Sequence, residues 1–333
     1  MDRKQFMLSL GAGLLSFLPD RVAATRSDRN ADVRDRQPMA RPTIIPAALS
    51  SFDQDGEIDY SEFRKHIRSL ADVVGVTAIM VNGGSGLDKA LTRDERRKLL
   101  DEALAAVDGK VPILGALRES TTIRTLGPLA EDAKAAGVQA MTMMPPGNEQ
   151  GFLWDNAQRR FEEACTASDL PVVIYHNRYE TEVLVRLAAE FPVIGIKEGS
   201  KDPATFEKNL RAIRELDPNI GIWSTHSQWL LADLAIGADG ILSGMGSITA
   251  DLHVALAEAV ERFDLATARK INDKLFPLTQ VFYRAGQNGH VRMMYALKKL
   301  GRRKHDYVRP PYKPLDAEER ARIDQALLES GLL

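Results

Sequence analysis

One lysine ends an apolar run, where a charged side chain is not expected unless it has a chemical role. Lys197 closes the run VIGIK, whose other residues are apolar enough to be buried on both faces of a parallel strand. Burial disfavours the ammonium form and lowers the pKa of a lysine. A neutral primary amine attacks a ketone and forms a Schiff base, so Lys197 is a candidate nucleophile. The structural alternative is a strand-end lysine paired with a carboxylate such as Glu198.

Two further side chains follow apolar runs and can move protons. Tyr175 ends the run PVVIY, and a phenol beside an amine can carry protons while an imine forms or a C–C or C–O bond breaks. Taken alone, such a tyrosine more often belongs to the core or rim. His226, in IWSTHSQWLL, would exchange a proton or hold a substrate hydroxyl at the mouth of the fold. Its alternative role is to cap a turn.

Two glycine-rich turns are candidate anion sites. The first, GGSG at 83–86, offers exposed backbone N–H groups and one hydroxyl, which suit a carboxylate, although a plain βα turn has the same composition. The second, SGMGS at 243–247, would bind a carboxylate or a phosphate. No group of His, Asp and Glu has the spacing of metal ligands, so we expect no metal cofactor.

Repeated βα units must position these residues. Apolar runs alternate with amphipathic stretches, and we expect eight strands at 44–48, 76–82, 111–116, 139–144, 171–175, 193–197, 220–224 and 238–242. The segment IIPAALSSFDQDG has no glycine fingerprint, which favours a (β/α)8 TIM barrel over a doubly wound open sheet. Helical patterns continue after the last strand. We therefore expect a barrel over 42–262 and a small C-terminal helical extension over 263–333.

Composition limits the partners. The 333 residues are 44% hydrophobic and 27% charged, as in ordinary globular proteins, and no apolar stretch reaches the roughly 18 residues of a membrane span. Basic and acidic residues nearly balance, 44 against 46, so no overall field attracts nucleic acid or an anionic membrane. A single cysteine, Cys165, excludes an intrachain disulfide framework. The expected partner is a small molecule.

The N-terminus has the order of an export signal. Arg3 and Lys4 precede an apolar stretch over 6–18, and small residues end at Ala24. Arg-Lys resembles the twin-arginine motif with lysine in the second place, which predicts export to the periplasm. The alternative is a cytoplasmic enzyme with an N-terminal extension. We expect the signal at 1–24 and a solvated linker at 25–41.

From Ile44 to Leu333 the chain resembles the dihydrodipicolinate synthase and N-acetylneuraminate lyase family of class I aldolases. The resemblance rests on IIPAALSSFDQDGEID, GGSGLDKALTRDER, VVIYHN, VIGIKEGS, GADGILSGMGS and the terminal SGLL. It implies a barrel that assembles as a dimer or tetramer, an imine between Lys197 and pyruvate or another 2-oxo acid, and no separate cofactor. It also implies Tyr175 as proton carrier. The candidates for substrate binding are Gly84, Ser85, His226, Leu242, Ser243 and Gly244.

The chain departs from the family pattern at the substrate end. Gly84 replaces one of two adjacent hydroxyl residues, and Leu87 replaces a glutamate. Pro146 and Gly147 stand where the synthases have paired tyrosines, and Glu180 stands at the position of their substrate-gripping arginine. The resemblance is therefore to a divergent member, and synthase activity in lysine biosynthesis is not expected.

The leading hypothesis is a Schiff-base lyase. It would perform aldol cleavage or condensation with pyruvate, or dehydrate a 2-keto-3-deoxy acid through the same imine. One alternative is a sugar-phosphate enzyme that uses the 243–247 turn, for which phosphate would be a competitive ligand. The other is a non-catalytic binding protein for 2-oxo acids, which would show no turnover.

The signal predicts where the mature protein begins. Val22-Ala23-Ala24 offers small residues at the positions that a signal peptidase reads, so we expect a mature N-terminus near Thr25. N-terminal sequencing of protein from the native host measures it. Recovery of intact Met1 protein from the cytoplasm alone would contradict export.

Overall fold

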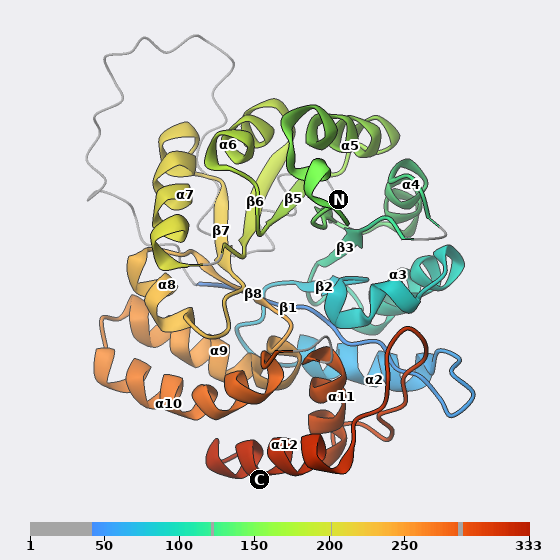
Figure 1. Cartoon of the computed structure of the whole chain (residues 1–333), viewed down its shortest axis with the longest axis vertical. Helices are drawn as coiled ribbons and strands as arrows, with labels where there is room; N and C mark the ends of the chain where they lie inside the picture. Colours follow the sequence, from blue (N-terminus) through green and yellow to red (C-terminus); the bar gives the residue numbers. More distant parts are fainter. Residues whose placement is uncertain (1–41, 121–122, 201, 286–288) are drawn as a thin grey trace.

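The computed structural model describes residues 42–120, 123–200, 202–285 and 289–333 (Figure 1). The expected export signal at 1–24 and linker at 25–41 lie outside the described residues. No helix of the described part is both long and apolar enough to cross a membrane.

Eight parallel strands form one sheet that closes on itself. Each overlaps the range expected from the sequence: β1 Thr43–Pro46, β2 Ile79–Val81, β3 Ile113–Leu117, β4 Ala140–Met143, β5 Val172–His176, β6 Val193–Glu198, β7 Gly221–Ser224 and β8 Gly240–Ser243. The strand order β1-β8-β7-β6-β5-β4-β3-β2 leaves β1 and β2 at its ends. A parallel bridge between Ala47 and Met80, with a 2.9 Å bond from Ala48 N to Met80 O, joins these two. The predicted barrel is confirmed.

Side chains alternate between the barrel interior and the helices outside it. The interior holds a separate apolar cluster whose members come from all eight strands or their ends: Ile45, Ala47, Ala78, Met80, Leu114, Ala116, Ala140, Met144, Val173, Ile194, Trp223 and Leu242. Trp223 takes its place because β6 and β7 carry glycines beside it. A Cβ on Gly195 would lie 2.3 Å from the Trp223 ring, and one on Gly221 would lie 2.8 Å from it.

Helices cover the outside of the barrel (Figure 1). Their bounds are α2 Tyr60–Ala71, α3 Arg93–Val107, α4 Gly127–Ala136, α5 Trp154–Ala167, α6 Thr181–Glu190, α7 Pro203–Leu216, α8 Leu230–Ile236 and α9 Gly246–Glu261. Side-chain N-caps set the start of several of these helices. Asp59 and Asp202 cap α2 and α7, and Thr92 with Glu95 forms a capping box at α3.

The expected C-terminal extension consists of α10 Leu265–Phe282, α11 Gly289–Lys299 and α12 Ala317–Glu329. Figure 1 shows these helices on one side of the barrel, next to α9 and α2. The segment after α11 is tied to the loops that follow β1 and β2. Arg303 donates to the Ser50 carbonyl, and Arg309 donates to the Ala90 carbonyl. The extension therefore reaches the end of the barrel where the strand-following loops lie.

Gly240 should be needed for barrel closure. It pairs with Thr43 across β8 and β1, its φ is +155°, and a Cβ there would lie 1.8 Å from the Thr43 carbonyl oxygen. We expect Gly240→Ala to lower the free energy of unfolding by more than about 2 kcal/mol, measured by urea denaturation. Gly147→Ala is the control, because nothing lies within 4 Å of a Cβ there. Equal stability of the two variants would contradict the prediction.

Candidate active site

Lys197, Tyr175 and Trp223 stand side by side on the inner face of the barrel. Strand register sets Tyr175 opposite Lys197 and Lys197 opposite Trp223. The Lys197 Nζ lies 4.3 Å from the centre of the Tyr175 ring, and the lysine is only 4% exposed. The structure therefore brings together the two residues that the sequence predicts to be catalytic.

The surroundings favour a neutral amine and a protonated phenol. Burial, followed by the positive charge of Arg118, lowers the pKa of Lys197 to about 7, while Asp88 opposes this shift. Burial also raises the pKa of Tyr175 to about 12. Near neutral pH much of the Lys197 population is an uncharged nucleophile beside a hydroxyl that keeps its proton.

Glu198 does not pair with Lys197. It occupies the next position of β6 and points to the outer side, where its carboxylate accepts a 2.7 Å bond from Ser200 N and a bond from the Asn209 amide. His176 of β5 lies beside it, 1% exposed, with its Nε2 3.1 Å from Asn209 Nδ2. The structural alternative for Lys197 is thereby removed, because its carboxylate partner faces away.

The cation near Lys197 is Arg118, which no local sequence pattern marks. Arg118, directly after β3, pairs with Asp88 at 2.6 Å, and its Nη1 donates to the Pro145 carbonyl. Arg96 of α3 is 2% exposed and supports this pair from below. It donates to the Asp88 carbonyl at 2.7 Å and the Arg118 carbonyl at 2.8 Å. The pair is therefore held in place by Arg96 and by the Pro145 carbonyl.

The two glycine-rich turns meet at the mouth of the barrel. Gly84–Gly86 forms a 3₁₀ turn in which Ser85 is 4% exposed. A Cβ on Gly244 would lie 2.8 Å from Ser85 Oγ, so glycine is required for this approach. Ser243 is already engaged, because its Oγ lies 2.7 Å from Ser227 Oγ and accepts from Met245 N. Ser85 is the freer hydroxyl, whereas Leu242 belongs to the apolar interior.

His226 lies apart from this group. Its Nδ1 is 3.0 Å from the fully buried Asp233, and its ring packs against Phe206 and Trp229. Among the described contacts none joins His226 to Lys197 or Tyr175. The chain turns outward after β7, so the ring approaches α7 and α8 and not the barrel interior.

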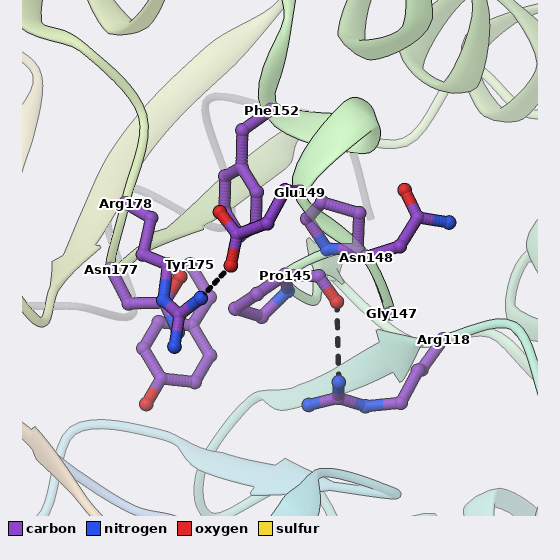
Figure 2. Close-up of a pocket in the computed structure, with 10 residues that line it drawn as sticks. Arg118, Pro145, Gly147, Asn148, Glu149, Phe152, Tyr175, Asn177 and Arg178 are labelled. Atoms are coloured by element: carbon purple, nitrogen blue, oxygen red, sulfur yellow. Dashed lines mark hydrogen bonds and ion pairs between the residues drawn. The ribbon is translucent and has the colours of Figure 1, made fainter.

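A cavity of about 250 Å³ opens beside Tyr175 (Figure 2). Its walls are Arg118, Pro145, Pro146, Gly147, Asn148, Glu149, Phe152, Tyr175, Asn177 and Arg178. Figure 2 shows Tyr175 and Arg118 toward the same end, with Arg178 paired to Glu149. The cavity contains two arginines, and each is already paired with a carboxylate.

The arrangement suits covalent chemistry on a carbonyl compound. It has a desolvated amine, a proton donor, and an adjoining polar cavity for the rest of the substrate. No cluster of three or more His, Cys, Asp or Glu side chains in the described residues has the geometry of a metal site.

Comparisons with known proteins agree with this fold. The model of the dihydrodipicolinate synthetase family matches residues 41–330. A probable 2-dehydro-3-deoxy-D-pentonate aldolase of Escherichia coli K12, YjhH, is 25% identical, covering 87% of this chain and 97% of that protein. The 4-hydroxy-tetrahydrodipicolinate synthase of Salinibacter ruber is 29% identical over 86% of this chain and 94% of that one.

Solved structures of similar proteins have the same fold. YagE of Escherichia coli K12, a dihydrodipicolinic acid synthase family protein in complex with pyruvate, superimposes with a TM-score of 0.81 at 25% identity. The match covers 99% of the YagE chain and 88% of this chain. A monomeric dihydrodipicolinate synthase variant gives a TM-score of 0.80 at 23% identity. That match covers 88% of this chain and 97% of the variant.

Removing the charge of Arg118 should raise the pKa of Lys197. Arg118→Met takes away a cation that disfavours the ammonium and leaves Asp88, which favours it. A lysine is acylated only when neutral, so the labelling curve of Lys197 should move from about pH 7 to higher pH. Competitive labelling with acetic anhydride, followed by peptide mass spectrometry, measures it. Arg211→Met, on the exposed face of α7, is the control, and a midpoint in Arg118→Met at or below that of the control would refute the prediction.

Proposed function

Because the chain belongs to the dihydrodipicolinate synthetase family, whose members are pyruvate-dependent Schiff-base lyases, we propose that Lys197 of this enzyme forms an imine with a 2-oxo acid. The observation that carries the proposal is the buried amine of Lys197, with its pKa near 7, against the Tyr175 ring. The family's lysine chemistry needs neither a metal nor an organic cofactor.

The two side chains divide the proton transfers. The Lys197 amine attacks C2 of the 2-oxo acid, and the former carbonyl oxygen gains two protons, one from the Lys197 nitrogen and one from Tyr175, before it leaves as water and the iminium forms. Tyr175, whose pKa is about 12, holds the proton that this step needs and can later recover one from the substrate. In an aldol cleavage the iminium accepts the electrons of the C3–C4 bond, while the C4 hydroxyl loses its proton and C4 becomes an aldehyde carbon. In a dehydration C3 loses a proton, and the C4 hydroxyl gains one and leaves as water.

We propose a 2-keto-3-deoxy sugar acid as the substrate class, with pyruvate as the product or co-substrate of the aldol route. The cavity beside Tyr175 is lined by amides and by arginines already paired with carboxylates, which suits hydroxyl groups. Glu180, where the family pattern has an arginine, lies at the N-cap of α6 and offers no cation to hold a second carboxylate. The similarity to YjhH, a probable 2-dehydro-3-deoxy-D-pentonate aldolase, supports the same class.

Neither the sugar-phosphate enzyme nor the non-catalytic binding protein gains support. A phosphate site on the 243–247 turn would need the Ser243 hydroxyl, which is already bonded to Ser227 and Met245. A non-catalytic binding protein does not accord with membership of a lyase family.

Assembly and location remain proposals. We propose a dimer or tetramer, supported by apolar side chains exposed in and before α10, where Phe263 is 94% exposed and Phe276 is 58% exposed. We also propose export to the periplasm, which is supported by the residue order of 1–24 alone.

Lys197 alone should form the covalent adduct. Incubation with pyruvate and cyanoborohydride should add one reduced pyruvyl group, which peptide mapping should locate at Lys197. Lys197→Arg should abolish both adduct and turnover, because a guanidinium does not provide a neutral primary amine. Lys208→Arg is the control, since that side chain is 60% exposed. An adduct mapped to another lysine, or unchanged turnover in Lys197→Arg, would overturn the proposed function.

Loss of the Tyr175 hydroxyl should slow the chemistry without unfolding the barrel. Tyr175→Phe keeps the ring against Lys197 and removes only the proton donor, so we expect kcat to fall by roughly 10²–10³. Steady-state turnover of the substrate found by adduct trapping measures it. Tyr307→Phe, at an exposed position, should keep full activity. A kcat within twofold of the unaltered enzyme would remove Tyr175 from the mechanism.

A further inference from the structure

The first turn of α11 brings a histidine to the place where the two glycine-rich turns meet. A Cβ on Gly84 would lie 3.6 Å from His290 Cε1. A Cβ on Gly244 would lie 3.5 Å from His290 Nε2 and 2.8 Å from Ser85 Oγ. The imidazole nitrogen and the serine hydroxyl thus converge on one small space, which exists because residues 84 and 244 have no side chain.

His290 belongs to the same electrostatic environment as the nucleophile. Burial, followed by the positive charge of Lys197, lowers the pKa of His290 to about 4. At neutral pH the ring is therefore uncharged, with one N–H donor and one acceptor nitrogen. Within residues 42–120, 123–200, 202–285 and 289–333, no hydrogen bond to this ring is formed, so its polar atoms are available to a ligand.

With the hydrogen of the neutral ring on Nε2, His290 and Ser85 would direct two donors at one space, which favours an anionic group over a neutral one. A hydrogen bond to a charged group contributes more than one between neutral partners, and a carboxylate has two oxygens to accept from both donors. In a 2-oxo acid the carboxylate is bonded directly to C2, the carbon that Lys197 would attack. It must therefore lie close to the Lys197 nitrogen.

Resting on the proposed function, we propose that His290 is a substrate-binding residue that donates from Nε2–H, beside Ser85 Oγ–H, to the carboxylate of the 2-oxo acid at Lys197. The residue comes from the C-terminal extension and not from a barrel strand. The extension thereby completes the site, and α11 selects compounds with a carboxylate next to the ketone.

The test compares two replacements of similar bulk in the full-length protein. His290→Leu fills the space without a donor, and His290→Gln restores an N–H. Cyanoborohydride trapping at increasing pyruvate concentration gives the half-saturating concentration and the maximal labelling of Lys197. We expect a rise of roughly 10- to 100-fold in the half-saturating concentration for His290→Leu, with recovery in His290→Gln. Maximal labelling should stay the same.

A neutral analogue separates carboxylate recognition from a structural role. Pyruvamide keeps the ketone but replaces the carboxylate with an amide, so His290→Leu should weaken its trapping much less than that of pyruvate. His305→Ala, at a histidine stacked on Tyr307 after α11, should change neither curve. A thermal melt of each variant checks folding, and if His290→Leu did not fold, His290→Met against His290→Gln would give the same comparison of a side chain without a donor and one with an N–H.

Two results would overturn the inference. One is an unchanged half-saturating concentration for pyruvate in His290→Leu, which together with a fall in turnover would make His290 a proton carrier. The other is an equal weakening of pyruvate and pyruvamide trapping. Absence of any adduct in the unaltered protein with pyruvate or a 2-keto-3-deoxy acid would instead reject the proposed function itself.

Discussion

A primary amine held out of water at the end of β6 is the constraint on which the site depends. Lys197 is useful as a nucleophile only if its proton is easily lost, and burial in the barrel interior achieves this. Burying a cation costs free energy of folding, so the barrel interior around Lys197 favours the neutral amine. Glycines on β6 and β7 admit the Trp223 ring, while Glu198, the nearest carboxylate in sequence, is directed to the outer side.

The cationic side of the site is built from a buried ion pair and not from a single arginine. Arg118 alone would raise the electrostatic cost of the Lys197 ammonium, whereas Asp88 moderates its effect. Arg96 donates to the backbone carbonyls of both residues and so links them. Such a pair tunes the pKa of the nucleophile and also presents one guanidinium to the adjoining cavity.

The proposed substrate end is built from loops. Pro146, Gly147 and the paired Arg178 and Glu149 shape the cavity beside Tyr175. The nucleophile and its tyrosine come from strands, whose geometry is rigid, and the cavity walls come from the loops after β3, β4 and β5. This division allows the loops to change without moving the amine.

Local sequence determined the architecture and indicated the proposed nucleophile. The apolar runs located all eight strands, the run before Lys197 indicated a buried amine, and strand register then required Tyr175 as its neighbour. Three features were decided only by the tertiary structure. His226 turned outward to Asp233, since strand alternation stops where β7 ends. Arg118 and His290 reached the site from a loop and from α11, and neither has a local pattern that marks it. The physical reason is that periodicity reports which face of an element is buried, whereas contacts between distant elements depend on how the barrel closes and where its extension packs.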